Sequence, residues 1–277
     1  ALLEKWQVLA GRRYAHRTVL TDRTLLSQAL EQAVTNGLLT RNPMRGVDAP
    51  IGVSKRREAP TPAEASRIIA LEENPVWKLQ WCLAFLGMRQ GERRGVTRGE
   101  LVYRDGVPGI LIRHQACRIE KGKTWPEYTS VTPIPAQPGW VYAPAKTQAG
   151  ERWVPLLGTA WEAWQAVDRL NPGGRDDLLC LSLHGCPLAQ ATERRAWARA
   201  LKRAGVDRPL VPHSARHTAD SILAMMGVPD ATRLGIIGHT TTAMDTVYVH
   251  AQTDAMIDAA RTLAERLESP TPLGAGA

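Results

Sequence analysis

The sequence contains few cysteines and no long apolar segment, and both shortages narrow the class of protein. Only four of the 277 residues are cysteines, and none forms a close pair of the zinc-binding type: Cys82, Cys117, Cys180 and Cys186. Scattered cysteines favour free thiols in a reducing cytoplasm over a secreted fold held by disulfides. No stretch of eighteen apolar residues occurs, which argues against a membrane-spanning helix and against a membrane partner.

The N-terminus also lacks the features of a secretory signal peptide. The segment "ALLEKWQVLAGRR" has no basic start followed by an apolar block. The first residue, Ala1, already stands inside a helical pattern, so we expect the chain to be an engineered or processed fragment. Together with the absence of internal repeats, the length predicts one large domain, or one large and one small domain.

Positive charge is concentrated near the N-terminus. The net charge is +8 and the pI is about 9.6. Residues 1–57 contain ten Lys or Arg side chains against four Asp or Glu side chains, so they hold most of the excess. A concentrated basic segment points to a polyanionic partner, most commonly a nucleic acid. The alternative is a solvated basic surface without a partner.

Apolar spacing divides the chain into helical and strand segments. Residues 18–39 place apolar side chains three and four positions apart, which predicts a helix that ends near Gly37. Proline and positive charge in residues 40–62 predict a linker. Thr61 and Glu64 are spaced as a capping box. Further helices are expected within 63–73, 76–88, 159–170, 189–205, 214–227, 229–238 and 253–268, and strands within 108–114, 139–144 and 152–156.

Two separated pieces carry cations that suit phosphate chemistry. In "LGMRQGERRG", Arg89 follows a buried helix and Glu92 stands three residues later. A guanidinium held rigidly there can bind a phosphate in bidentate fashion, whereas a surface salt bridge is the plainer alternative. The segment "KTQAGE" joins two predicted strands as a hairpin, with Lys146 near its tip. This lysine either donates a proton in a groove or is simply solvated.

Two later pieces hold histidines and a lone tyrosine. In "HSARH", His213 shares one helix face with Arg216 and with His217. The histidine pair has zinc-site spacing, but no acidic third ligand accompanies it, so we expect no metal. In "GHTTTAMDTVYVH", His239 follows a glycine and Tyr248 stands nine residues later. Taken alone, such a tyrosine is more often a packing residue with a solvated hydroxyl.

The order and spacing of these pieces resemble the tyrosine recombinase family of the phage integrase type. "GMRQGE" resembles the family's first arginine box, "KTQAGERWVPL" its lysine hairpin, and "HSARHT" with "IIGHTTTAMDTVYVH" its second box. "AVTNGLLTRNP" resembles the end of its core-binding domain, and "EAPTPAEASRII" the entry to its catalytic domain. The resemblance covers residues 18 to 250. It implies a strand-transferring enzyme of a phage or mobile element that recombines or integrates DNA at specific sites.

The resemblance assigns the two arginines to charge stabilisation. Arg89 and Arg216 would clamp the non-bridging oxygens of a phosphodiester and stabilise its transition state. Glu92 would fix the orientation of Arg89. Because two guanidiniums and one amine supply the positive charge, we expect neither a metal nor another cofactor.

The remaining catalytic roles concern bond and proton transfer. Tyr248 would attack the phosphorus and form a covalent 3′-phosphotyrosyl link, which lets the strand be rejoined without ATP. A phenol of pKa about 10 keeps its proton at neutral pH, so His213 would accept it. Lys146 would protonate the departing 5′ oxygen. His239 would donate a hydrogen bond to a phosphate oxygen.

The implied partner is double-stranded DNA at attachment or core sites, bound in the nucleoid of a bacterial cytoplasm. The resemblance also implies a homotetramer on the DNA and accessory DNA-bending or directionality proteins. Candidate phosphate contacts lie in the basic N-terminal segment and on helix 189–205, where a solvated helix face is the alternative. They are Arg12, Arg13, Arg17, Arg23, Arg41, Lys55, Arg56, Arg57, Arg194, Arg195, Arg199, Lys202 and Arg203.

The last helix carries a narrow apolar stripe that consists of Met256, Ile257, Ala260, Leu263, Ala264 and Leu267. The stripe either folds back on its own domain or docks on a neighbouring protomer. We expect the second arrangement, which would build the tetramer. Residues 269–277 are expected to be disordered.

The expected fold is therefore α+β: mainly helical, with one small antiparallel sheet. Residues 1–50 would form the C-terminal part of a helical, basic DNA-binding domain, residues 51–60 a linker, and residues 61–268 the catalytic domain with its tail helix. Two other functions stay open. A type IB topoisomerase would relax supercoils without choosing a site, and a DNA-binding regulator would lack catalysis. The separate basic segment favours site-specific binding, and the complete set of catalytic residue types argues against a regulator.

Overall fold

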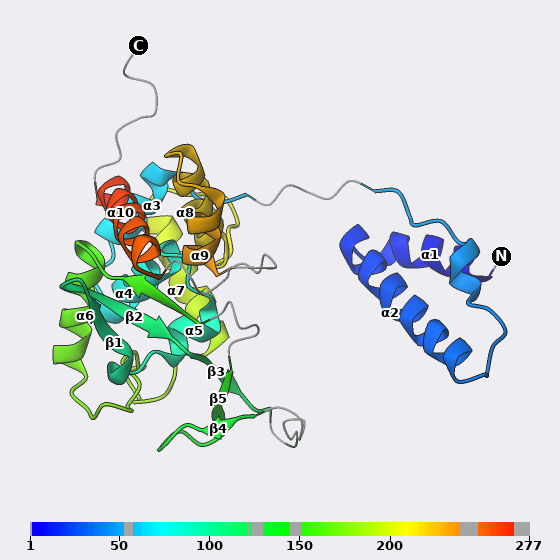
Figure 1. Cartoon of the computed structure of the whole chain (residues 1–277), viewed down its shortest axis with the longest axis horizontal. Coiled ribbons are helices and arrows are strands. Elements are labelled where there is room, and N and C mark those ends of the chain that lie inside the picture. The colour runs from blue at the N-terminus through cyan, green and yellow to red at the C-terminus, as the bar shows by residue number, and fades with distance from the viewer. Residues whose placement is uncertain are drawn as a thin grey trace, which may run out of the picture. The chain divides into compact units, whose positions relative to one another are not determined.

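The computed structural model describes residues 2–52, 58–120, 122, 130–144, 151–238 and 249–268 (Figure 1). The chain separates into two compact units, residues 1–57 and residues 58–277. Each unit has its own packing, and each is described by itself. Lys55, Arg56 and Arg57 and the tail 269–277 lie outside the described residues.

The N-terminal unit consists of two helices and a short helical turn. They are α1 (Leu2–Arg13), α2 (His16–Thr35) and the 3-10 helix η1 (Pro43–Gly46). The prediction of a helix over 18–39 is confirmed by α2. Residues 43–47, at the start of the proline-rich segment 40–62, pack against α2 and belong to this unit, whereas the linker over 51–60 stays a prediction. Met44 is only 1% exposed, and Arg23 donates a hydrogen bond to the carbonyl of Val47.

The larger unit is a helical body with small sheets. Its helices are α3 (Pro62–Ala70), α4 (Pro75–Phe85), α5 (Gln90–Gly95), α6 (Thr159–Leu170), α7 (Gln190–Arg203), α8 (Ser214–Met225), α9 (Asp230–Ile237) and α10 (Val249–Glu268), with a 3-10 turn, η2, at Arg98–Glu100. The predicted capping box at the start of α3 is confirmed: Glu64 N–H donates to Thr61 Oγ1 at 3.2 Å, and Thr61 N–H donates to Glu64 Oε2 at 2.7 Å.

Helix α4 forms the centre of this body. Its residues are apolar around most of the helix, so it is buried on nearly all sides, between α3, α6 and α8. Trp81 and Leu79 are fully buried. The ring of Trp81 packs edge to face against that of Trp197 of α7, with 5.0 Å between the ring centroids. The segment that leads from the C-terminal end of α4 to Arg89 therefore starts from a buried, well-packed helix. No described helix is both long and apolar enough to cross a membrane.

The strands form two antiparallel sheets instead of the single sheet that we expected. The first sheet has the order β1 (Leu101–Arg104), β2 (Val107–Ile112) and β6 (Arg152–Pro155), and the second has the order β3 (His114–Arg118), β5 (Trp140–Pro144) and β4 (Thr132–Pro133). The predicted pairing of segments 139–144 and 152–156 as a hairpin is wrong. Ile110 pairs with Val154 of β6, and Ala116 pairs with Tyr142 of β5. Figure 1 shows β3, β5 and β4 extending away from the helical body.

The apolar stripe of α10 is buried within its own domain, which is the first of the two arrangements considered above. Leu263 is fully buried and Met256 is 7% exposed, and α10 lies beside α3, α8 and α9 (Figure 1). At its C-terminal end, Glu268 Oε1 accepts hydrogen bonds from Thr159 N–H at 2.7 Å and from Thr159 Oγ1 at 2.9 Å. Glu268 therefore caps α6, and both α10 and α6 are stabilised by this contact.

A buried acid joins the two sheets near η2. Glu100 lies with its Oε1 3.5 Å from His114 Nδ1, and His114 Nε2 is 2.9 Å from the carbonyl of Gly95. Burial raises the pKa of Glu100 to about 7, although the Thr97 amide and Arg113 oppose this shift. Burial also lowers the pKa of His114. Near neutral pH the two groups therefore form a neutral contact more readily than an ion pair.

We expect Glu100 to make the protein less stable as the pH rises. Its pKa is about 4.5 in the unfolded chain and about 7 in the folded chain, so between these values unfolding releases a proton. The stability relative to Glu100→Gln should fall by about 3 kcal/mol between pH 4.5 and pH 8, and should not change below pH 4.5. Urea unfolding of both proteins across this range measures the difference. A difference that does not vary with pH would contradict the assignment.

Candidate active site

Arg89 stands at the junction between α4 and α5, as the sequence suggested. Its backbone N–H donates to Glu92 Oε2 at 2.7 Å, and its Nη1 donates to Glu92 Oε1 at 2.9 Å. Glu92 therefore holds both the backbone and the side chain of Arg89. The Arg89 side chain is 34% exposed, so its guanidinium is oriented by the protein and still reaches solvent.

Arg216 reaches the same place from α8. Its side chain is buried, and it donates through Nη1 to the carbonyl of Gly87 and through Nη2 to the carbonyl of Gly238 at 3.4 Å. Arg89 Nη2 donates to the same Gly238 carbonyl at 2.6 Å. Two guanidiniums that are 127 positions apart in the sequence thus meet at one oxygen atom. The carbonyl belongs to the C-terminal end of α9, where helix carbonyls carry partial negative charge.

Two glycines make this convergence possible. Gly87 has φ +84° and Gly238 has φ +69°, a left-handed conformation that side chains rarely adopt. A Cβ atom on Gly238 would lie 2.8 Å from Arg152 Nη1, and a Cβ atom on Gly87 would lie 2.6 Å from Ile237 Cδ1. Both turns therefore need glycine so that their carbonyls can face the arginines.

Arg152 is a third arginine in this cluster, and the sequence reasoning missed it. Its Nε donates to the carbonyl of Ile236 at 2.9 Å and its Nη2 donates to Glu92 Oε2 at 2.9 Å. It begins β6, and its side chain is only 4% exposed. Arg152 thereby connects the end of α9 to the start of α5. The available signal was a charged residue at the head of the otherwise apolar segment "RWVPL".

The cluster carries excess positive charge. Burial alone would raise the pKa of Glu92, but Arg152 and the hydrogen bonds to Arg152 and Arg89 lower it to about 2. Burial, together with the neighbouring charges of Arg89 and Arg152, lowers the pKa of Arg216 to about 9. The described cluster contains three guanidiniums, and the carboxylates that act on it are those of Glu92 and Asp220. This surplus favours the binding of an anion.

The other predicted catalytic residues are placed differently. His213 is exposed and precedes α8, one turn ahead of Arg216, and its ring lies 5.3 Å from that of His217 in an edge-to-face arrangement. Lys146, His239 and Tyr248 lie outside the described residues. Gly238, whose carbonyl binds both arginines, is the neighbour of His239 in the chain. Within the described ranges, no group of three His, Cys, Asp or Glu side chains is arranged to hold a metal ion.

The predicted phosphate contacts are largely solvent-facing. In the N-terminal unit, Arg12, Arg13, Arg17 and Arg41 are exposed, while Arg23 is engaged with Val47. On α7, the exposed residues include Arg194, Arg195, Arg199 and Lys202. Arg203 instead forms an ion pair with the buried Glu72.

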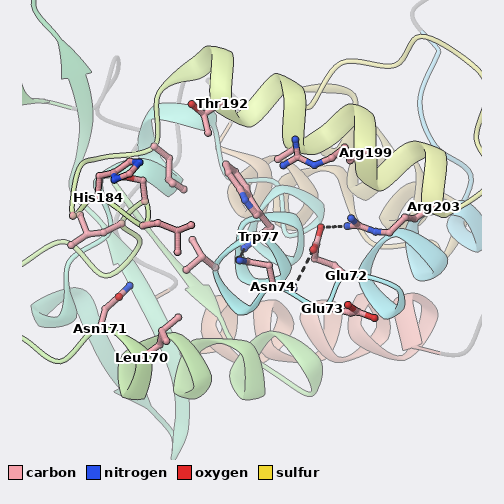
Figure 2. Close-up of a pocket in the computed structure, with 17 residues that line it drawn as sticks. Glu72, Glu73, Asn74, Trp77, Leu170, Asn171, His184, Thr192, Arg199 and Arg203 are labelled. Carbon is pink, nitrogen blue, oxygen red and sulfur yellow. Dashed lines mark hydrogen bonds and ion pairs between the residues drawn. The ribbon is translucent and has the colours of Figure 1, made fainter.

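A sizeable cavity elsewhere in the larger unit does not contain this cluster. Its volume is about 830 Å³, and it lies between the start of α4, the end of α6, the segment 181–188 and α7. Figure 2 shows Trp77, Arg199 and Arg203 around it, with Arg203 bonded to Glu72. None of the residues that line it belongs to the arginine cluster, so the cluster and the cavity are separate features.

The comparisons with known proteins agree with the fold. Residues 136–254 match the phage integrase family. An integrase from Saccharopolyspora erythraea is 28% identical over 141 residues, which are 47% of this chain and 31% of that relative. The matched region is thus about a third of the relative's length. The predicted resemblance to tyrosine recombinases is confirmed by these matches.

Solved integrase structures share the same fold. The Tn1549 transposon integrase, solved in complex with transposon right end DNA, has a TM-score of 0.68 at 21% identity and covers 96% of this chain and 84% of its own. A lambda integrase dimer bound to a COC′ core site has a TM-score of 0.53 at 18% identity, over 84% and 76% of the two chains. A lambda integrase tetramer bound to a Holliday junction has a TM-score of 0.55 at 18% identity, and the match covers 88% of this chain and 65% of that chain. The predicted class, mainly α with a small amount of antiparallel sheet, is confirmed, with two small sheets in place of one.

Proposed function

Because the chain carries a phage integrase family match over residues 136–254 and a tyrosine recombinase fold over most of its length, we propose that it is a site-specific DNA recombinase. It cleaves and rejoins DNA through a 3′-phosphotyrosyl intermediate. The observation that carries this proposal is the meeting of Arg89 and Arg216 at the Gly238 carbonyl, braced by Glu92 and Arg152.

The arginines prepare the site for a phosphodiester. The group is a monoanion whose two non-bridging oxygens gain charge as a fifth ligand approaches phosphorus. Arg89, which is partly exposed, and Arg216, which is buried, offer guanidinium N–H groups that are already oriented. Since little reorganisation is needed, their charge stabilises the transition state more than the ground state.

The covalent step uses the residues that follow from the family resemblance. The Tyr248 phenol gives its proton to His213, and its oxygen forms a bond to phosphorus. The bond from phosphorus to the 5′ oxygen breaks, and that oxygen takes a proton from Lys146. His239 donates a hydrogen bond to a non-bridging oxygen. The reverse sequence, with a 5′ hydroxyl as nucleophile, rejoins the strand.

The substrate is double-stranded DNA at a core-type site, and the assembly that exchanges strands is a homotetramer. This part of the proposal is supported by the lambda integrase structures on a core site and on a Holliday junction. Exposed arginines of the N-terminal unit and of α7 supply contacts to phosphates away from the reaction centre. Accessory DNA-bending or directionality proteins act on the same complex.

Covalent capture tests the proposal directly. The full chain is incubated with a pool of nicked duplexes of random sequence, in which cleavage releases the short fragment that carries the new 5′ hydroxyl and so traps the enzyme on the DNA. We expect an SDS-resistant adduct that also forms in EDTA, and sequencing of the trapped DNA should yield one motif. Tyr248→Phe should form no adduct, because the nucleophilic oxygen is absent. An adduct in that variant, or its loss in EDTA, would contradict the mechanism.

Relaxation of supercoiled DNA separates this function from that of a topoisomerase. We expect no relaxation of a plasmid that lacks the captured motif, and cleavage after the motif is inserted. Relaxation of both plasmids at equal rates would favour the type IB topoisomerase alternative. Absence of any adduct, despite tight DNA binding, would favour a non-catalytic regulator.

A further inference from the structure

A second cationic feature lies beside α5, on the side facing the second sheet. It is an open groove of about 750 Å³, bounded by α5, β3, β5 and the first residues of α7. Helix α5 can approach β3 closely because of its glycines: a Cβ atom on Gly95 would lie 2.8 Å from the Ala116 amide nitrogen. Gln90, which directly follows Arg89 in the sequence, lines the groove, so one end of the groove lies next to the arginine cluster.

Arg94 is the unusual residue in the wall of this groove. It is only 8% exposed, and its Nε and Nη2 atoms are buried with no hydrogen-bond partner among the described residues. Its guanidinium carbon lies 5.1 Å from the centre of the Trp140 ring, which also lines the groove. Burial lowers the pKa of Arg94; the neighbouring charge of Glu193 opposes this shift, and that of Arg93 adds to it. These two nitrogens have lost water without a described acceptor, which costs stability, and an anion in the groove would offset that cost.

The rest of the groove has the composition of an anion site. Arg118 provides a second guanidinium, and among the described residues that line the groove Glu120 is the acidic one. Gln190 and Ala191 lie at the first turn of α7, a helix of 14 residues whose N-cap, Ala189, provides no side-chain acceptor. The first turn of this helix therefore lies at the groove, where the partial positive charge of its N–H groups is partly offset by Glu193 of the same turn. Guanidiniums and helix N–H groups together suit a phosphate oxygen.

We propose that the Arg94 groove binds a phosphate of the DNA backbone near the strand held by Arg89 and Arg216. This inference rests on the proposed function, because it takes the arginine cluster to be the place where a DNA strand lies. Backbone phosphates follow one another every ~3.4 Å of helix axis along a strand, so one held by Arg89 has close neighbours. Arg94 anchors such a neighbour and does not act in bond breakage.

Salt-dependent DNA binding tests the groove. Binding of a 40-bp duplex to Tyr248→Phe protein, with and without Arg94→Met, is measured by fluorescence anisotropy from about 50 to 200 mM KCl. We expect Arg94→Met to weaken binding about tenfold at the lowest salt concentration and to reduce the slope of log K against log salt by about 1. Arg169→Met, an exposed arginine on α6 outside the groove, is the matched control and should change neither quantity.

Thermal unfolding separates binding from a merely structural role. Arg94→Met should melt at the same or a higher temperature, because it removes a buried charge that has no acceptor. If the methionine disturbs packing against Trp140, Arg94→Gln provides the same readouts with a neutral polar side chain. An unchanged salt slope in both variants would overturn the proposal. So would a lower melting temperature combined with unaltered DNA affinity.

Inorganic phosphate distinguishes the two sources of the anion. If phosphate at constant ionic strength raises the melting temperature of the parent but not of Arg94→Met, while the DNA salt slopes are equal, the groove binds free phosphate and the DNA assignment is wrong. The background variant cannot form an adduct, so these measurements do not depend on cleavage. Failure of covalent capture would therefore refute the proposed function, whereas an unchanged slope would refute only the role of Arg94.

Discussion

Arg216→Lys is expected to slow formation of the covalent DNA adduct by about a thousandfold or more. The estimate follows from the loss typical of an arginine that stabilises a transferring phosphoryl group. Arg216 donates to two carbonyls, those of Gly87 and Gly238, from the two ends of one planar fork. A lysine ammonium is a point charge that cannot span both carbonyls and also face a phosphate.

Single-turnover adduct formation on the captured DNA motif measures this effect, with anisotropy to report binding. DNA affinity should change by only a few-fold, because most of it comes from other phosphate contacts. Arg67→Lys is the matched control: Arg67 Nε also donates to a backbone carbonyl, but to that of Ala204 and not to those of Gly87 and Gly238. The assignment fails if Arg216→Lys retains more than a tenth of the parent rate.

The second large effect concerns stability. Arg152→Met should destabilise the larger unit by about 3–5 kcal/mol, because Glu92 stays buried after its main counter-ion has gone. The melting temperature should fall by about 10 °C for a unit of this size. Arg261→Met, which removes an exposed ion pair with Asp258, should cost less than about 1 kcal/mol and serves as the control.

A double variant separates folding from catalysis in the same cluster. Replacing both partners, in Arg152→Met with Glu92→Leu, buries neither charge and should recover more than half of the lost stability. Adduct formation should stay low, because Arg89 has lost the carboxylate that orients it. If the double variant unfolds as readily as the single variant, the ion pair between Arg152 and Glu92 is not the cause. If it cleaves at the parent rate, Glu92 does not position Arg89.

Local signals in the sequence were sufficient to predict the helices and to identify two arginines of the cluster, Arg89 and Arg216. The capping box of Thr61 and Glu64 involves residues three positions apart, so its pattern is readable without knowing the fold. Arg89 could be found because it follows a strongly apolar helix, and Arg216 because of its spacing from His213. In each case the chemical reason lies within a few residues of the site.

Long-range partners explain what the sequence did not reveal. Alternation identifies a strand but not the neighbour it pairs with, so β5 and β6 were joined as a hairpin although each belongs to a different sheet. Arg152 was overlooked because its partners, Glu92 and Ile236, are 60 and 84 positions away. Arg94 resembles any arginine of a polar helix until its burial beneath Trp140 is known.

The packing of α10 against its own domain fixes the point at which the preceding segment of the chain ends. Val249, which directly follows Tyr248 in the sequence, is the first residue of α10. The apolar stripe of this helix packs against α3, α8 and α9, and its last residue, Glu268, caps the N-terminal end of α6. If α10 left its position on the domain, Leu263, which is fully buried, would be exposed to water at a cost in stability.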